Sequence, residues 1–250
     1  MSVSMIALLG HSPPVVTEAV QYLSNLEGRA FRDVVVLSTS DDFVRAGVKL
    51  IEASLQVNYP RVRLHDIMME NEDVLTDEDN LSMMERLAEA IRRERDDYGA
   101  RKIYLNVSGG RKIASISASL FGSLLGVTNI LHIVNRDVHT FNENLERARS
   151  EIEEFLNRDD IVEYYQSRKG LFDRILYPPP ETLYFLNIPV IPYPPDSLER
   201  LVRMLRGLYF EEEFVPDFVL ERYKEAGLIV YDRIRTYPTE LGERILRILR

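Results

Sequence analysis

Short apolar runs alternate with amphipathic stretches along the first half of this 250-residue chain. Strands that are separated by helices longer than about ten residues are typical of βαβ units, and therefore of a parallel sheet. Continuous apolar runs such as residues 6–9 fit strands that are covered on both faces. The expected strands are residues 3–9, 33–38, 62–67, 102–107 and 129–134. The expected helices lie at about residues 15–26, 42–58, 81–97 and 113–125.

This alternation predicts the α/β fold class, with a Rossmann-like parallel sheet in a first domain of residues 1–192. In the strand order 3-2-1-4-5, the first and fourth strands are neighbours and the loops that follow them diverge. Open α/β sheets bind their ligands at this switch point. The loops after the first and fourth strands are therefore the expected ligand site.

The regular alternation ends after Val134. The polar and strongly charged residues 142–166 predict one or two exposed helices, and residues 182–191 have the composition of another strand. Proline-rich breaks lie on either side of that strand, at residues 177–181 and 192–195, and the second of them is typical of a linker.

Residues 197–250 are expected to form a small C-terminal domain. Helical patterns cover residues 197–208, 217–226 and 239–249, and residues 227–237 fit a two-stranded wing. Thr239, four residues ahead of Glu243, marks the expected start of the last helix. This order of elements resembles a short winged helix-turn-helix.

The composition excludes several classes of protein. There is no cysteine, which excludes disulfides and Cys-ligated zinc and fits a reducing compartment. No run approaches about 18 apolar residues, and the first residues lack the segments of a secretory signal. We therefore expect a soluble cytoplasmic protein with no membrane partner. The net charge of -9 opposes broad nucleic-acid binding, although a locally positive cleft still admits a small anion.

The first candidate loop is Gly10-His11-Ser12-Pro13-Pro14, between the first expected strand and helix. Gly10 allows a sharp turn, and the helix N-terminus that follows presents free N–H groups to an anion. Ser12 is predicted to cap this helix, with Pro13 or Pro14 in its first turn. A capped helix start and an anion contact need the same geometry, so the loop fits both interpretations.

The second candidate loop is Ser108-Gly109-Gly110-Arg111-Lys112, after the fourth expected strand. The two glycines permit close approach of the backbone to a ligand. Arg111 and Lys112 lie at the start of the next helix, where each cation opposes the helix dipole by about 0.3–1 kcal/mol. A bound anion removes this penalty, which favours an anion site over two solvated surface cations.

The other candidates carry weaker signals. His11 is either a proton carrier or a polar loop residue, and Ser12 lacks the pattern of a nucleophile elbow. The first loop also lacks the Gly-x-Gly-x-x-Gly motif of a dinucleotide site. Metal-ligand spacing is missing for the other histidines, which are His65, His132 and His139. An acidic cluster fits a cation site or, as we favour, a solvated loop and helix start; it comprises Glu70, Glu72, Asp73, Asp77, Glu78 and Asp79. We expect no metal and no cofactor.

Taken together, a first strand that ends in Gly-x-Ser-Pro and a fourth that ends in Ser-Gly-Gly-Arg-Lys resemble the CRISPR-associated Rossmann fold (CARF) domain, especially the standalone archaeal ring nucleases. The resemblance covers about residues 1–190. It implies a homodimer that binds a cyclic oligoadenylate, usually cyclic tetraadenylate, across its twofold axis. It also implies metal-independent cleavage of this second messenger to linear products with a 2′,3′-cyclic phosphate, which switches off type III CRISPR signalling.

Carried over by position, the resemblance implies roles for individual residues. Ser12 would hold the ribose or phosphate at the scissile bond, while Arg111 and Lys112 would hold phosphates and stabilise the developing charge. Lys169 is matched to a lysine that the family places in a later segment. The ligand-binding residues would be Gly10, His11, Pro13, Thr39, Ser108, Gly109 and Gly110.

Two positions depart from the pattern of the nucleases. His11 stands where they more often have threonine, and Pro14 replaces a frequent glycine. These differences would alter the fit of the ligand or the rate of cleavage.

Three functions remain open: a ring nuclease, a transcription regulator that senses the ring and binds DNA through its tail, and a binder that sequesters the messenger. Residues 197–250 carry ten Lys or Arg and ten Asp or Glu, so they lack the basic excess of a DNA-binding domain. The acidic residues 211–213 adjoin the candidate recognition helix, where they repel phosphates. We therefore expect the enzyme, with no duplex DNA partner and a tail that serves dimerisation or shielding.

Overall fold

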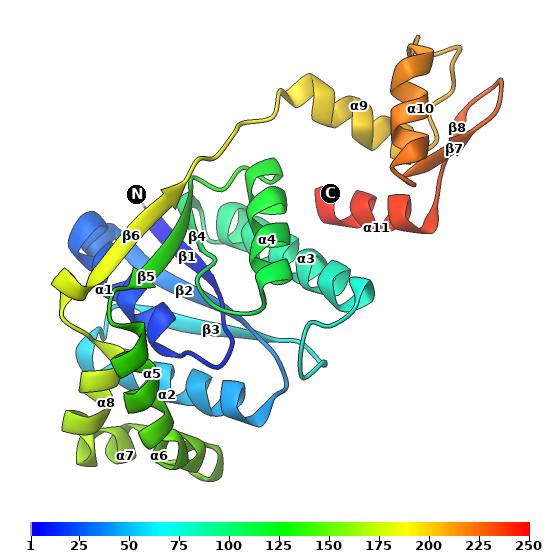
Figure 1. Cartoon of the computed structure of the whole chain (residues 1–250). Coiled ribbons are helices and arrows are strands. Elements are labelled where there is room, and N and C mark those ends of the chain that lie inside the picture. The colour runs from blue at the N-terminus through cyan, green and yellow to red at the C-terminus, as the bar shows by residue number, and fades with distance from the viewer. Residues whose placement is uncertain (1) are drawn as a thin grey trace. The chain divides into compact units, whose positions relative to one another are not determined.

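The computed structural model describes residues 2–250, and its contacts divide them into two compact units, one ending at Val190 and one running from Ile191 to Arg250 (Figure 1). The first unit is built on a six-stranded sheet with the order β3-β2-β1-β4-β5-β6. Its strands are β1 (Ser2–Leu8), β2 (Phe31–Ser38), β3 (Arg63–Met68), β4 (Ala100–Asn106), β5 (Asn129–Asn135) and β6 (Leu183–Ile188).

The sheet confirms the predicted α/β class and the predicted strand order. The pairs from β3 through β5 are parallel, whereas β6 runs antiparallel to β5 at the edge of the sheet. The sixth strand, expected at residues 182–191, is therefore also confirmed. Because β1 lies between β2 and β4, the chain has its switch point at the carboxyl ends of β1 and β4.

Four helices follow the first four strands, and local sequence sets where each begins. They are α1 (Pro14–Glu27), α2 (Asp42–Asn58), α3 (Asp77–Arg92) and α4 (Lys112–Leu124). Pro14 occupies the first turn of α1, and the Asp41 carboxylate accepts a hydrogen bond from Val44 N at the start of α2. A capping box of Thr76 and Asp79 begins α3. The short 3-10 helix Gly28–Ala30 extends α1, and the π-helical turn Arg93–Asp97 extends α3.

The helices α1 and α4 cover opposite faces of the sheet. Two consecutive residues of β4 show this, because successive side chains of a strand point to opposite faces. The Asn106 amide donates to the carbonyl of Val15 on α1, whereas a Cβ atom placed on Gly122 of α4 lies 2.5 Å from Leu105 Cδ2. The core on the α1 face is formed by β1 and β2 with α1 and α2, and it includes Met5, Val16, Val20, Val36 and Ile51.

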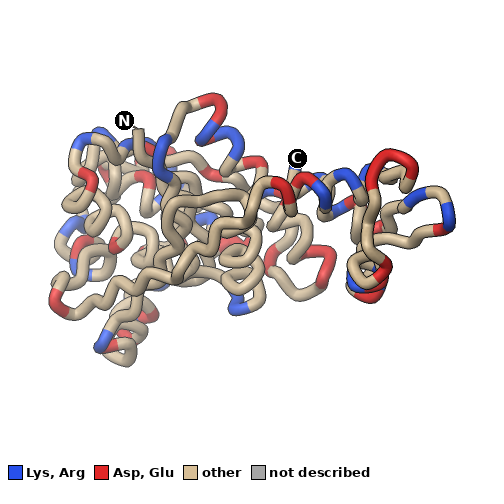
Figure 2. Tube along the Cα trace, turned by 90° about the horizontal axis from the view of Figure 1, so that it is seen from above, with Lys and Arg blue, Asp and Glu red and all other residues tan. Residues whose placement is uncertain are grey.

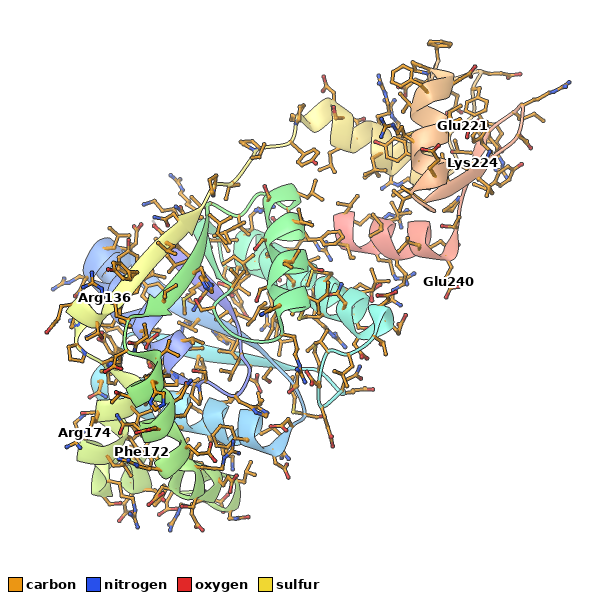
Figure 3. All side chains as sticks on the ribbon, in the orientation of Figure 1. Arg136, Phe172, Arg174, Glu221, Lys224 and Glu240 are labelled. Carbon is orange, nitrogen blue, oxygen red and sulfur yellow. The ribbon has the colours of Figure 1, made fainter. Side chains whose placement is uncertain are left out.

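The segment after β5 differs from the prediction of one or two exposed helices. It forms α5 (Val138–Arg147), α6 (Arg149–Glu153), α7 (Ile161–Ser167) and α8 (Lys169–Leu176), with the 3-10 turns Glu154–Asn157 and Pro180–Thr182. Its aromatic side chains pack against the outer face of α2 in a second core, around Phe155, Tyr165 and Phe172 (Figure 3). The prediction of full exposure was wrong because these few large apolar residues are spaced among many charges. The burial of three aromatic rings outweighs the polar average.

The second unit contains α9 (Pro195–Leu205), α10 (Asp217–Glu225), the antiparallel pair β7 (Ile229–Tyr231) and β8 (Thr236–Pro238), and α11 (Glu240–Leu249). The expected three helices and two-stranded wing are therefore confirmed as elements, and Thr239 caps α11 through Gly242 N. A small core holds them together, formed by Met204, Leu205, Leu208, Leu220, Ile229 and Leu246. Along α10, Glu221 and Lys224 form an ion pair (Figure 3). Throughout residues 2–250, no helix is both long and apolar enough to cross a membrane.

Candidate functional site

The two predicted loops meet at the carboxyl ends of β1 and β4. A Cβ atom placed on Gly10 lies 3.1 Å from the backbone nitrogen of Gly110, so the two backbones are in contact. His11 and Ser12 therefore emerge beside Arg111 and Lys112. The structure thus brings together the two loops of the predicted ligand crevice.

The tandem glycines make this contact possible. A Cβ atom on Gly109 would lie 2.2 Å from the carbonyl oxygen of Leu8, which is shorter than any non-bonded contact. Gly110 has a φ of 77°, in the left-handed region that favours glycine. Both glycines are therefore needed for the loop itself, whether or not a ligand is bound.

Asn106 fixes the second loop from inside the fold. Its side-chain oxygen accepts from the backbone N–H of Ser108 at 3.1 Å and from the Ser108 hydroxyl at 2.7 Å. The amide of Asn106 donates to Val15 at 2.8 Å, and Ile133 N donates to the Ser108 hydroxyl at 2.7 Å. The Ser108 hydroxyl therefore joins β4 to β5, and its ligand contact stays a prediction. Asn106 is fully buried and was missed in the sequence.

The helix N-termini at the crevice differ from those around it. Side chains cap α2, α3 and α5 through Asp41, Thr76 and Asp137. No side chain caps α1 or α4, whose N-cap residues are Pro13 and Arg111. In α1, however, Pro13 and Pro14 carry no N–H group, and the N–H groups of Val15 and Val16 donate to the carbonyl oxygens of Ser12 and Pro13. The first N–H groups of α4 are therefore the ones left for water or for an anion.

The prediction that Ser12 caps α1 was wrong, because the chain enters the helix one residue later, at Pro13. The Ser12 side chain is half-buried and is free to contact a ligand. Pro13 is buried, and its ring packs against Gly47 of α2. A Cβ atom placed on Gly47 would lie only 2.8 Å from Pro13 Cγ, so the ring occupies the space that a side chain there would need. Pro13 therefore supports the loop from behind instead of lining the crevice.

Arg111 and Lys112 lie in different electrostatic environments. The Arg111 guanidinium forms a two-pronged ion pair with Asp73, with distances of 3.0 Å and 2.9 Å from Nε to the two carboxylate oxygens. This hydrogen bond lowers the pKa of Asp73 and raises that of Arg111. Lys112 is exposed, and no carboxylate within residues 2–250 pairs with its ammonium group. Lys112 is therefore the cation that is free to meet an incoming phosphate.

His11 is not isolated in its loop. Its Nε2 lies 3.2 Å from Oδ1 of Asp41, and its ring stands edge-on to Phe43 at a centroid distance of 5.6 Å. Thr39 lies close by in the chain, after β2, but it is 8% exposed. Its hydroxyl has no hydrogen-bond partner in the described part of the chain. Thr39 therefore lies at the rim of the site with its side chain directed into the protein.

Lys169 does not belong to this crevice. Its Nζ donates to Asn58 Oδ1 and pairs with Asp173 at 2.8 Å. Asn58 ends α2, whereas Asp41, beside His11, precedes its first residue. The 17 residues of α2 separate the two positions by about 25 Å at 1.5 Å per residue. The structure therefore places Lys169 away from the two loops, and its match to a site lysine rests only on order along the chain.

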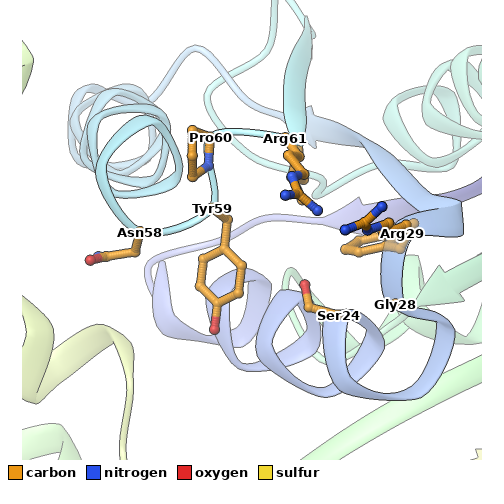
Figure 4. A pocket seen from close by; sticks show the side chains of 9 residues that line it. Ser24, Gly28, Arg29, Asn58, Tyr59, Pro60 and Arg61 are labelled. Atoms are coloured by element: carbon orange, nitrogen blue, oxygen red, sulfur yellow. The ribbon is translucent and has the colours of Figure 1, made fainter.

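A cavity of about 450 Å³ lies at the opposite edge of the sheet (Figure 4). It is formed where α1 and α2 end and where β2 and β3 begin. Ser24, Arg29, Tyr59 and Arg61 line it, together with Asn58, and none of the predicted site residues does. The crevice at the switch point is thus distinct from this cavity.

Two acidic residues of the crevice were missed in the sequence. Asp73 belongs to the acidic cluster interpreted as a solvated loop, yet its carboxylate holds Arg111. Asp41 has the sequence signal of a helix cap, directly before α2, but its contact with His11 joins residues 30 positions apart. Only the parallel sheet brings these loops to one edge.

The chain is similar to a known protein family, to a characterised relative and to a solved structure. A sequence model of the family described as CRISPR-associated protein NE0113 matches residues 12–215. The chain is 29% identical over 162 residues to the CRISPR system ring nuclease SSO2081 of Saccharolobus solfataricus, which covers 63% of this chain and 86% of that protein. The structure of Enterococcus italicus Csm6 bound to cyclic hexa-2'-fluoro-hexa-dAMP aligns with a TM-score of 0.46 and 12% identity, over 82% of this chain and 46% of the Csm6 chain.

The family match confirms the resemblance to CARF-type CRISPR-associated proteins that the two loop motifs predicted. It includes Ser12, Arg111 and Lys112 and extends over more than half of the chain. The chain therefore belongs to the family of CRISPR-associated protein NE0113.

Proposed function

We propose that this protein is a ring nuclease that binds cyclic tetraadenylate and cleaves it without a metal ion. The observation that supports the proposal is the close approach of Gly10 to Gly110, which joins the loop of Ser12 to the uncapped N-terminus of α4, where Lys112 lies. N–H groups at helix ends and a free ammonium are the groups that recognise a phosphodiester. The similarity to the ring nuclease SSO2081 supports the same reaction class.

The proposed reaction is attack of a ribose 2′-hydroxyl of the ligand on its own neighbouring phosphate. The ring then opens to a 2′,3′-cyclic phosphate and a free 5′-hydroxyl. Because nucleophile and phosphate belong to one molecule, the protein needs to hold them in line and to stabilise the charge that develops. Ser12 orients the ribose, and Lys112 with the N–H groups of α4 stabilises the phosphate oxygens. Arg111 holds an adjacent phosphate.

A twofold homodimer is part of the proposal, because a cyclic tetranucleotide presents the same groups twice. The helix α4, which begins at Lys112, exposes the apolar side chains of Ile113, Ile116 and Leu120. The spacings of three and four residues place them on one face of the helix. Burial of this stripe against a second copy would bring two Lys112 residues toward one ligand.

The alternative is a transcription regulator that binds DNA through the second unit. Lys and Arg are interspersed with Asp and Glu along the chain (Figure 2), and Glu213 pairs with both Arg200 and Arg203 of α9. These ion pairs reduce the positive charge available to DNA phosphates. A gel shift with duplex DNA at about 0.1 M salt tests this alternative, and sequence-specific nanomolar binding would favour the regulator.

The direct test of the proposal is incubation of the pure protein with radiolabelled cyclic tetraadenylate in EDTA. We expect linear diadenylates that end in a 2′,3′-cyclic phosphate. If the ring is bound but remains intact, the protein sequesters the messenger. If the ring is neither bound nor cleaved, the proposed function is wrong.

A further inference from the structure

We propose that His11 is the proton donor to the 5′-oxygen that leaves during ring opening, held in place by Asp41. This inference rests on the proposed function and assigns a residue to a step that Ser12 and Lys112 do not perform. An alkoxide is a poor leaving group, and a positioned acid commonly accelerates its departure by about 10²–10⁴-fold.

The place of His11 in the crevice is the first argument. It lies between Gly10, whose backbone meets Gly110, and the half-buried Ser12. The His11 side chain is 61% exposed, so a ligand in the crevice has access to its ring. Lys112, by contrast, is proposed to stabilise charge on the phosphate oxygens.

The fixed orientation of the ring is the second argument. Asp41 Oδ1 accepts from Val44 N at 3.0 Å as the N-cap of α2, and the same oxygen lies 3.2 Å from His11 Nε2. A carboxylate that is itself tied to a helix end gives the imidazole a defined orientation. With Nε2 directed at Asp41, Nδ1 is the nitrogen left to face the ligand. The edge-on contact with Phe43 limits rotation of the ring.

Two carboxylates and one guanidinium lie around His11. Asp41 contacts the ring directly. Asp73 lies nearby: the hydrogen bond from Arg111 is the main cause of its lowered pKa, and the charge of His11 is a smaller cause. Phe43, on the α2 side, carries the Arg149 guanidinium on its ring at 4.3 Å. Of these groups, Asp41 makes the direct contact, and it supplies the counter-charge of an imidazolium.

The step balances without any further reactant. A bond forms between the 2′-oxygen and phosphorus while the bond from phosphorus to the 5′-oxygen breaks. The 2′-hydroxyl proton passes to water, and the proton on Nδ1 of His11 passes to the 5′-oxygen. His11 then regains a proton from the solvent, and no atom is oxidised or reduced.

The test uses cyclic tetraadenylate in which sulfur replaces the bridging 5′-oxygens, because a thiolate leaves without protonation. His11→Ala should slow single-turnover cleavage of the normal ring by about a hundredfold, with its dissociation constant nearly unchanged. On the sulfur ring, the variant should come within about threefold of wild type. Lys112→Ala should stay slow on both rings, because sulfur does not replace a group that stabilises phosphate charge.

Asp41→Asn is the matched variant for the positioning role, because asparagine caps a helix as well as aspartate does but carries no charge. This variant should cleave the oxygen ring about tenfold more slowly than wild type, and it should cleave the sulfur ring at nearly the wild-type rate. His139, which is exposed and pairs with Glu143 within α5, provides the control histidine, and His139→Ala should match wild type.

The outcomes separate the two proposals. If wild type cleaves the normal ring but His11→Ala is equally fast, or stays slow on the sulfur ring, the proton-donor role is wrong and the ring nuclease stands. If wild type cleaves neither ring, the ring nuclease proposal fails as well.

Discussion

Gly109 has no room for a side chain of any size. The carbonyl oxygen of Leu8 occupies the space that any side chain would need, so β1 and the loop after β4 must separate to admit one. The close approach of Gly10 to Gly110 then opens as well. This contact explains in physical terms why a tandem glycine follows β4.

Gly109→Ala should therefore destabilise the fold by about 3 kcal/mol, which lowers the melting temperature by roughly 6–12 °C. Gly170→Ala is the matched control, because a Cβ atom at Gly170 meets nothing within 4 Å and alanine favours a helix. Thermal unfolding followed by circular dichroism compares the two. An unchanged melting temperature for Gly109→Ala would contradict the packing of the two loops.

Glu18 on α1 is a buried carboxyl group at 3% exposure, and its Oε1 has no hydrogen-bond partner in residues 2–250. Burial raises its pKa from 4.5 to about 8. The unfolded chain loses this proton near pH 4.5 and the folded protein near pH 8, so stability falls as the pH rises between these values.

Glu18→Gln removes this titration at nearly constant volume. Its advantage over wild type in the free energy of unfolding should grow by roughly 3–5 kcal/mol from pH 4.5 to pH 8. Denaturant unfolding at both values measures it, with Glu89→Gln on the exposed face of α3 as the control. A difference that stays constant with pH would show that Glu18 is solvated.

Among the helices, α4 is the one to which we assign two separate proposed functions along its length. Its first turn offers uncapped N–H groups and the free ammonium of Lys112 to the crevice. Its outer face exposes Ile116 at 58% and Leu120 at 63%. One helix thus joins the ligand site to the proposed dimer surface.

Ile116→Glu should dissociate the proposed dimer, because it places a charge in an apolar interface where it has no partner. Sedimentation equilibrium should show a dimer for wild type and a monomer for the variant. Leu26→Glu, a substitution at an exposed leucine of α1, is the control and should remain dimeric. A wild-type protein that is monomeric at micromolar concentration would contradict the dimer.

Sequence periodicity predicted some elements at their observed bounds and missed the packing of others. Periodicity predicted α2 at its observed bounds, since residues 42–58 bury one face on the sheet and are capped by Asp41. It missed the core around Phe155, because α5 to α8 bury a few aromatic residues among many charges. The loops at Gly10 and Gly110 could be predicted from the sequence, because a glycine directly after an expected strand indicates a sharp turn.

Contacts between distant loops had no such signature. The pairs of His11 with Asp41 and of Asp73 with Arg111 exist only because a parallel sheet gathers the carboxyl ends of its strands at one edge. Lys169 was assigned by its order in the chain alone, and the fold places it at the other end of α2. Spacing along a sequence therefore predicts elements better than it predicts contacts between loops.

At the scale of the whole molecule, the account predicts that two chains share one ligand. A twofold axis beside the crevice makes the pocket of a ring from two identical halves. Isothermal titration of a cleavage-impaired variant with cyclic tetraadenylate should give one ring per two chains. A stoichiometry of one ring per chain would contradict the shared pocket.

We propose that Lys112 stabilises the transition state, because its free ammonium at the start of α4 can follow charge onto the phosphate oxygens. An interaction that strengthens only in the transition state appears in the rate and not in the affinity. Ser12→Ala should reduce the rate more mildly, because the Ser12 hydroxyl orients the ribose without stabilising charge. Lys224→Ala, at an exposed lysine of α10, is the control and should match wild type.

The most direct test is the single-turnover rate of cyclic tetraadenylate cleavage by Lys112→Ala, measured in EDTA beside the dissociation constant of the ring. If Lys112 stabilises the transition state, the rate should lie about a hundredfold below wild type, with a much smaller change in affinity. A rate equal to that of wild type would contradict this role and would leave Lys112 as a solvated surface cation.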